Sequence, residues 1–213
     1  MSYQKKNTAT SSIDCHASSV APLDYSFLSL TCCSEAVDDE PRNNSPRKTK
    51  AQTSSKKKIL EKDGEPEEKP KSKSHGIKLN NNSIGDLGTL LTTVETLFEN
   101  PEGVYLVDLS FNEVATVDHL LHLPQLRSLY LHSNNITDLK EVDKLATLKH
   151  LTKLTLHGNP IESIKDYRCY VLAKLPQLKQ FDFSQITTKD RETANAPAHK
   201  NINKKTKKPK TEG

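Results

Sequence analysis

The chain of 213 residues has no tryptophan, one methionine, seven glycines and four cysteines, and apolar residues make up only 33% of it. It has no glycine-rich run that would cradle a phosphate. No stretch reaches the ~20 apolar residues that span a bilayer, and no apolar run follows Met1–Lys6, so we expect neither a membrane span nor a secretory signal. Cys15, Cys32 and Cys33 lie in a polar stretch and Cys169 in a helical pattern, which predicts no disulfide framework and a reduced, cytoplasmic compartment.

The apolar residues and the charges are unevenly distributed. Leu, Ile, Val and Phe are concentrated between about 77 and 186, and Lys, Ser, Thr, Asn, Pro and Glu dominate elsewhere, which predicts disordered tails. Residues 1–75 carry 13 Lys/Arg against 11 Asp/Glu, residues 76–186 carry 10 against 13, and residues 187–213 carry 8 against 3. The folded part is therefore mildly acidic. A nucleic-acid-binding domain shows the reverse, so nucleic acid is not an expected partner.

One frame, apolar-x-apolar-x-x-Asn-x-apolar, occurs four times. The copies are Ile77-Lys-Leu79-Asn-Asn-Asn82-Ser-Ile84, Val107-Asp-Leu109-Ser-Phe-Asn112-Glu-Val114, Leu129-Tyr-Leu131-His-Ser-Asn134-Asn-Ile136 and Leu154-Thr-Leu156-His-Gly-Asn159-Pro-Ile161. This is the leucine-rich repeat signature, in which repeats stack because none can bury its apolar face alone. We predict that the four asparagines are structural, because an amide can both donate and accept where the chain leaves each strand.

The segments between the frames complete the predicted architecture. Residues 86–98 have one apolar helical face with Asp86 as a candidate N-cap, and Leu123-Pro-Gln-Leu126 and Leu175-Pro-Gln-Leu178 each precede a strand. We predict an α/β leucine-rich repeat solenoid of about four repeats with a C-terminal cap and disordered tails. The predicted bounds are 1–75 for a mostly disordered N-terminal tail and Lys/Glu/Pro linker, 76–166 for the repeats, 167–191 for the cap and 192–213 for a disordered basic tail.

Strand alternation predicts which side chains point away from the core onto a concave face. The predicted columns across the strands are Lys78–Asp108–Tyr130–Thr155–Asp182 and Asn80–Ser110–His132–His157–Ser184. These residues are the candidate partner-binding set. Tyr130 stands out as a large aromatic anchor in the middle of a strand row, although it is equally well interpreted as a surface tyrosine packed on its neighbours.

Catalytic and metal chemistry have little support in the sequence. His132, His157 and Asp182 would form a small metal or acid/base cluster, but two histidines are too few ligands for structural Zn²⁺. Ser184 beside His157 and Asp182 has the composition of a nucleophilic triad, but neither a glycine-flanked elbow nor an oxyanion loop accompanies it. We therefore predict no enzyme activity, no metal and no cofactor.

For two segments outside the repeated frames the sequence is compatible with more than one role. The run Lys204–Lys210 is a solvated tail, a nuclear import signal or an electrostatic anchor to acidic protein, microtubule or RNA surfaces. The apolar island Leu23–Leu28 is either a docking segment that folds on binding or a segment that packs on the open N-terminal end of the solenoid.

Several motifs carry a resemblance. Val107-Asp-Leu-Ser-Phe-Asn112, Leu156-His-Gly-Asn-Pro160 and Tyr167-Arg-Cys-Tyr-Val-Leu172 resemble the intracellular class of short leucine-rich repeat proteins that end in a capping helix. A narrower resemblance to one small member of this class covers about 21–42 and 77–191. It rests on Pro22–Phe27, Glu40–Arg42, Leu79–Asn82 and Phe181–Ser184 with Lys189–Arg191. The resemblance implies a small cytoplasmic repeat protein without catalytic residues. The chain departs from it in the Lys/Glu/Pro linker at 43–75.

The function predicted from these observations is a non-enzymatic adaptor or scaffold that binds one or more proteins on its concave face. The alternatives are a ciliary, axonemal or cytoskeletal structural component and a nuclear or RNA-associated adaptor. We expect the chain by itself to be monomeric. The sequence does not identify the partner.

Overall fold

The computed structural model describes residues 20–43 and 70–196. Seven short strands form one sheet in chain order, with parallel pairing from β1 to β6 and an antiparallel β7. The strands are β1 (Leu23–Asp24), β2 (Gly76–Lys78), β3 (Leu106–Asp108), β4 (Ser128–Tyr130), β5 (Lys153–Thr155), β6 (Gln180–Phe181) and β7 (Ser184–Gln185). The predicted α/β leucine-rich repeat solenoid is confirmed by this parallel sheet of short strands.

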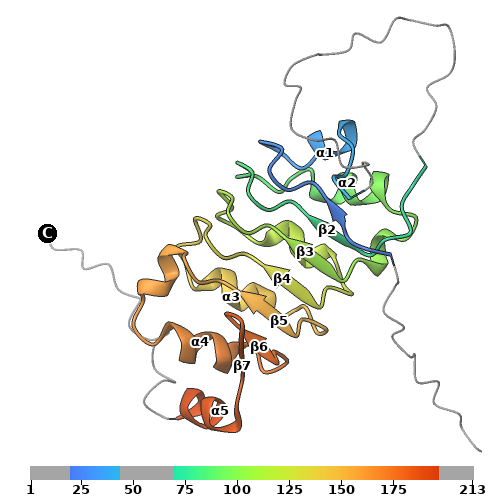
Figure 1. Cartoon of the computed structure of the whole chain (residues 1–213). Coiled ribbons are helices and arrows are strands. Elements are labelled where there is room, and N and C mark those ends of the chain that lie inside the picture. Colours follow the sequence, from blue (N-terminus) through green and yellow to red (C-terminus); the bar gives the residue numbers. More distant parts are fainter. Residues whose placement is uncertain (1–19, 44–69, 197–213) are drawn as a thin grey trace, which may run out of the picture.

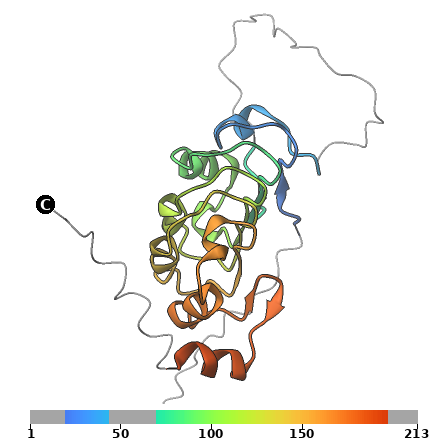
Figure 2. The ribbon, with the colours of Figure 1, turned by 90° about the vertical axis from the view of Figure 1, so that its left-hand side faces the viewer.

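Helices return the chain from one strand to the next on the opposite side of the core. The α-helices are α1 (Glu35–Asp38), α2 (Leu90–Leu97), α3 (Lys140–Leu145), α4 (Tyr167–Lys174) and α5 (Thr188–Asn195), and 3₁₀ helices span Pro101–Gly103, Asp118–His122 and Pro160–Ser163. Figure 1 shows the repeats stacked side by side, and Figure 2 shows the strands along one side with most helices along the other. We call the open side of the sheet the concave face.

The leucines of the repeated frames form the core between these two layers. Leu79, Leu109 and Leu131 have no exposed surface, and each belongs to a different repeat of one continuous apolar cluster. Full burial of such a side chain stabilises the fold by ~1.5–3 kcal/mol relative to exposure. Stacking is therefore what makes each repeat stable.

The helix predicted over 86–98 is shorter than expected. α2 begins at Leu90, and its N-cap is Thr89 rather than Asp86. The Asp86 carboxylate instead accepts the N–H of Gly88 at 2.9 Å, which makes a turn two residues long. Asp is well suited to such a local turn because its short side chain reaches the backbone two residues on.

Residues 20–43 fold onto the solenoid, where the sequence led us to expect a disordered tail. β1 pairs with β2, with Leu23 opposite Ile77, and Tyr25, Leu30 and Cys33 are buried. The structure thus places the Leu23–Leu28 island on the N-terminal end of the solenoid. The predictions for 1–19, for 44–69 and for the basic run Lys204–Lys210 lie outside the described residues.

The C-terminal end is built from α4, β6, β7 and α5. The ring centroids of Tyr167 and Phe181 lie 5.7 Å apart. The Arg168 guanidinium lies over the Phe181 ring, 5.5 Å from its centroid. These bulky groups cover the last leucine layer. α5 continues to Asn195, past the end predicted for the cap at 191.

Candidate functional site

The four asparagines of the frames link each repeat to the preceding one. The Asn112 amide donates to Leu79 O at 2.9 Å and to Leu109 O at 3.1 Å, and its oxygen accepts the N–H of Ile84 at 3.0 Å. Asn134 and Asn159 make the equivalent bonds one and two repeats later. Because these amides satisfy backbone groups inside the turns, they hold the scaffold and do not face a ligand.

The first repeat escaped the sequence pattern because it lacks this asparagine. Leu23-Asp-Tyr25-Ser-Phe-Leu28-Ser-Leu30 follows the same frame with Leu28 in the Asn position. The N–H groups of Leu28 and Leu30 are bonded to the oxygen of Asn82 in the next repeat, at 3.0 and 3.1 Å. No repeat precedes Leu28 in the described residues, so an amide there would have no turn to bridge.

The predicted columns of concave-face residues match the register of the sheet as far as β5. Lys78 lies opposite Asp108, Asp108 opposite Tyr130, and Tyr130 opposite Thr155. The residues within each column differ in solvent accessibility. Ser110 and Thr155 are buried, whereas Ser184 is exposed and the partly exposed members are Lys78, Asn80, Asp108, Tyr130, His132, His157 and Asp182. The accessible part of the face is therefore smaller than the predicted set.

The columns break at Asp182. Its backbone is left-handed, with φ of 47°, and its carboxylate accepts the N–H groups of Leu156 at 2.7 Å and His157 at 3.1 Å. In the inner repeats such N–H groups bond to a carbonyl of the following strand, as the N–H of Leu131 does to Thr155 O. β6 ends at Phe181, so no strand carbonyl lies opposite the residues that follow β5, and the Asp182 carboxylate accepts their N–H groups instead.

Ser184 lies outside the column predicted for it. It is exposed in β7, which turns back antiparallel on β6 and pairs Ser184 with Phe181. The register that would have put Ser184 beside His157 and Asp182 is therefore not the one that the sheet has. Among the residues that the structure describes, no group of three or more His, Cys, Asp or Glu side chains is placed to hold a metal ion.

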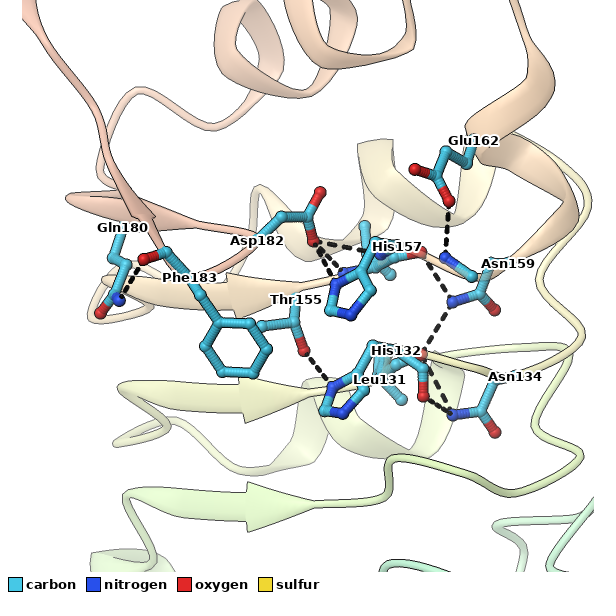
Figure 3. A network of polar contacts seen from close by, with 12 residues as sticks. Leu131, His132, Asn134, Thr155, His157, Asn159, Glu162, Gln180, Asp182 and Phe183 are labelled. Atoms are coloured by element: carbon cyan, nitrogen blue, oxygen red, sulfur yellow. Dashed lines mark hydrogen bonds and ion pairs between the residues drawn. The ribbon is translucent and has the colours of Figure 1, made fainter.

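The turn at Asp182 puts Phe183 on the concave face instead. The Phe183 ring stacks on Tyr130 with centroids 6.1 Å apart and planes 22° apart, and its carbonyl accepts a hydrogen bond from the Gln180 amide at 3.1 Å. The ring also meets His132 and His157 edge-on at 5.5 and 5.6 Å (Figure 3). Simple strand alternation would have placed Phe183 in the core, which is why the sequence did not identify it.

The two histidines form the centre of this arrangement. Their rings stack with centroids 4.7 Å apart and planes 10° apart. Nδ1 of His132 lies 2.9 Å from the Thr155 hydroxyl, and Nδ1 of His157 lies 3.3 Å from the Asp182 carboxylate. Burial lowers the pKa of His132, and the neighbouring His157 lowers it further. The two rings are thus in contact and form an aromatic stack.

Phe111 completes the group and was also missed. Its ring meets His132 edge-on at 5.2 Å, and its backbone is left-handed with φ of 55°. The other repeats with an asparagine have Asn81, Ser133 and Gly158 at the same turn position. A bulky phenylalanine is unusual there, and this difference between the repeats could have identified Phe111 from the sequence alone. We call Phe111, Tyr130, His132, His157 and Phe183 the aromatic cluster.

Comparison with known proteins agrees with the fold. A family model described as "Leucine-rich repeat" matches residues 71–210. Leucine-rich repeat-containing protein 51 of Rattus norvegicus is 41% identical over 185 residues, which cover 86% of this chain and 88% of the rat protein. The human protein of the same name is also 41% identical, with the same coverage of the two chains. The chain belongs to the leucine-rich repeat-containing protein 51 family. The resemblance found in the sequence is thereby confirmed.

Two solved structures are similar to the chain at a lower level. The Drosophila melanogaster SNF/U2A' complex contains a chain that is 24% identical, with a TM-score of 0.49 over 61% of this chain and 74% of that one. The Mex67 leucine-rich repeat domain of Chaetomium thermophilum is 27% identical, with a TM-score of 0.41 over 49% and 76%. None of the helices that the structure describes in this family member is long and apolar enough to cross a membrane.

Proposed function

We propose that the chain is a non-enzymatic adaptor that holds a protein partner on its concave face, centred on Tyr130. The observation that carries this proposal is the aromatic cluster. Phe111 and Phe183 expose 51% and 58% of their surface beside Tyr130 and the stacked histidines, on the open side of the sheet. Stacked repeats in general present such extended surfaces to partners.

The physical character of the cluster suits protein binding. Aromatic side chains contribute large contact areas with few rotatable bonds, and they are enriched among the residues that dominate interface energies. Here the rings are already fixed against one another, since Phe183 touches three of its neighbours and His132 is held by Thr155. A partner would therefore lose little free energy in ordering them.

We further propose that this adaptor acts in the cytoplasm. The support is compositional: the spacing of Cys15, Cys32, Cys33 and Cys169 does not suggest a disulfide framework, as is usual for proteins of a reducing compartment. Imaging of a tagged full-length chain in intact cells tests the location. A signal confined to the nucleus or to a secretory compartment would contradict it.

The binding proposal is tested by affinity capture with a double variant, Tyr130→Ala with Phe183→Ala. Removing two central aromatic contacts lowers affinity by more than about tenfold, since each such anchor is worth ~1–2 kcal/mol or more. Capture from cell extract followed by quantitative mass spectrometry measures the loss.

The matched control is Phe27→Ala, because Phe27 is exposed to 64% and has a left-handed backbone like Phe111, but belongs to the first repeat. Thermal unfolding by circular dichroism verifies that both variants keep their fold. Retention of every captured protein by the folded double variant would contradict the proposal. Equal loss in the Phe27→Ala control would contradict the central position of Tyr130.

A further inference from the structure

An Asp-x-Ser-Phe unit occurs twice in the repeats with nearly the same geometry. The first is Asp24-Tyr-Ser-Phe27 and the second is Asp108-Leu-Ser-Phe111. In both, the carboxylate accepts hydrogen bonds from the N–H, at 3.0 Å, and from the hydroxyl of the serine two residues on. In both, the phenylalanine backbone is left-handed, with φ of 58° and 55°.

Burial in the apolar core does not account for the two phenylalanines. A left-handed backbone is unfavourable for a bulky side chain, and both rings are more than half exposed and lie outside the apolar core. The unit therefore displays a phenyl ring at a conformational cost to the backbone. Such strained, displayed groups are found where a protein recognises something.

In the first unit an arginine of the chain lies over the phenylalanine ring, although it forms no ion pair with the Asp24 carboxylate among the described residues. The guanidinium carbon of Arg42 lies 5.7 Å from the centroid of the Phe27 ring. One guanidinium nitrogen also donates to Ser26 O at 2.9 Å. A cation over an aromatic face is attracted by the ring quadrupole, and arginine is the most frequent cation in such contacts.

The second unit holds no such cation among the described residues. No Lys or Arg side chain of the described part lies over the Phe111 ring or pairs with Asp108. Lys78 is opposite Asp108 in the sheet, yet the two side chains form no ion pair there. The Ser110 carbonyl already accepts the N–H of Asn81 at 3.0 Å, so a cation at this unit would use the ring and the carboxylate.

The surroundings of Asp108 favour a cation further. Tyr130 lies directly across the sheet from Asp108, and Phe111 follows it in the same repeat. Burial raises the pKa of Tyr130, and the negative charge of Asp108 raises it further, as expected for a carboxylate across the sheet from the ring. The segment 76–186, which forms most of this face, carries 13 Asp/Glu against 10 Lys/Arg, and such an excess of negative charge favours basic segments.

We propose that Asp108, Phe111 and Tyr130 form a subsite for an arginine side chain that a partner protein presents to the concave face. The proposal rests on the proposed function and adds the chemistry of the partner. A guanidinium fits because it is planar, stacks on aromatic rings and pairs with a carboxylate at its edge. The stacked histidines and Phe183 then contact the apolar residues beside that arginine.

The direct test uses a single-residue probe, N-acetyl-arginine methylamide, titrated into the full-length chain and followed by the NMR signals of the Phe111 and Tyr130 rings. We expect saturable shifts with a dissociation constant in the millimolar range, as befits one cation–π contact and one exposed ion pair. The matched probe carries citrulline, which has the same shape without the charge, and binds at least about fivefold more weakly. Equal shifts with citrulline, or no saturable shift with arginine, would overturn the proposal.

The matched variants are Asp108→Asn and Asp24→Asn. Asparagine keeps an oxygen that accepts the serine N–H and removes the charge, so both variants retain the turn. We expect Asp108→Asn to weaken binding of the arginine probe about three- to tenfold, and Asp24→Asn, whose unit is occupied by Arg42, to change it less than about twofold. Binding by Asp108→Asn equal to that of the wild-type chain would refute the subsite.

These outcomes are separable from the proposed function. Loss of a captured partner in the Tyr130→Ala, Phe183→Ala variant, together with probe binding that ignores Asp108, would keep the concave face as the binding surface and refute arginine as its ligand. Probe binding that depends on Asp108, with every captured partner retained by the double variant, would instead refute the adaptor proposal.

Discussion

The two ends of the solenoid are closed by different means. At the N-terminal end, the outer edge of β1 is covered by two residues from beyond α1. The N–H of Arg42 donates to Asp24 O at 2.7 Å, the Asn43 amide donates to Pro22 O at 2.7 Å, and its oxygen accepts the N–H of Asp24 at 3.3 Å. Arg42 and Asn43 thus take the place of a further strand, which protects an edge that would otherwise pair with other chains.

At the C-terminal end, the chain closes its own edge by turning back. Asp182 bonds to β5, β7 pairs with β6, and the Arg191 guanidinium of α5 donates to four carbonyls around the end of α4. The acceptors are Leu172, Leu175, Pro176 and Leu178, and the bond to Leu178 is 2.6 Å long. Cations favour the C-terminal ends of helices, where carbonyls are unpaired.

This difference shows that the contacts that close the two ends join residues at different separations in the sequence. The C-terminal contacts span at most 26 residues, between Asp182 and Leu156, whereas β1 pairs with β2 over a separation of 54 residues, from Leu23 to Ile77. Closing a longer loop costs more chain entropy. The N-terminal repeat is therefore expected to open before the rest of the solenoid, and three predictions test this order.

The largest effect is expected at the C-terminal end, for Arg191→Ala. Loss of the guanidinium leaves several carbonyls without a partner and lowers the free energy of unfolding of the whole solenoid by about 2–3 kcal/mol. Chemical denaturation followed by circular dichroism measures it. Arg191→Lys keeps the charge but not the planar fork and should recover only part of the loss. A change below about 0.5 kcal/mol in Arg191→Ala would contradict this role, because that is the scale of an ordinary surface substitution.

An intermediate and local effect is expected for Asn82→Ala. The Asn82 amide joins the first repeat to the second through Leu28, Leu30 and Tyr25. Its loss costs ~1–2 kcal/mol and increases hydrogen exchange in residues 20–43 more than in residues 128–156. Asn80→Ala is the matched control, since the Asn80 side chain makes no hydrogen bond to the described residues. Uniform acceleration of exchange along the solenoid would show that the ends are not independent.

The effect that is smallest near neutral pH, because it develops only in alkali, is again expected in the first repeat. Burial raises the pKa of Tyr25 from 10.0 to about 12 and that of the Cys33 thiol from 9.0 to about 12. Both groups are neutral when protonated, and their pKa values are lower in the unfolded repeat than in the folded one. As the pH rises, the unfolded repeat therefore loses these protons first. Their contribution to stability is complete below pH 9 and is lost as the pH rises towards about 12.

Hydrogen exchange and phenolate absorbance measured between pH 9 and 12 test this loss. Tyr25→Phe removes the tyrosine contribution and should flatten the pH dependence of exchange in residues 20–43. An unchanged slope in Tyr25→Phe would contradict the assignment to this phenol. Tyr167 provides the contrast, because burial also raises its pKa, but it belongs to the C-terminal end.

Much of the fold was predictable because the repeat frame ties residue identity to position. The period of apolar residues identified the core layers, and the register of Lys78, Asp108, Tyr130 and Thr155 followed from alternation alone. The candidate site was predictable only in part. The predicted column placed His132 and His157 on neighbouring strands, where their rings stack, but Phe111 and Phe183 were missed. Alternation cannot describe a residue whose backbone is left-handed, since its side chain leaves the strand pattern.

The sequence by itself determined which side chains are buried in each repeat, because burial of leucine layers is favourable in any stack of this period. Only the tertiary structure decided where the stack begins and ends. An asparagine is needed at a turn only when another repeat precedes it, so the first repeat could dispense with one and remain hidden in the pattern. The last strand stops where the Asp182 carboxylate replaces a backbone carbonyl, and that single turn moves Phe183 from the core to the concave face.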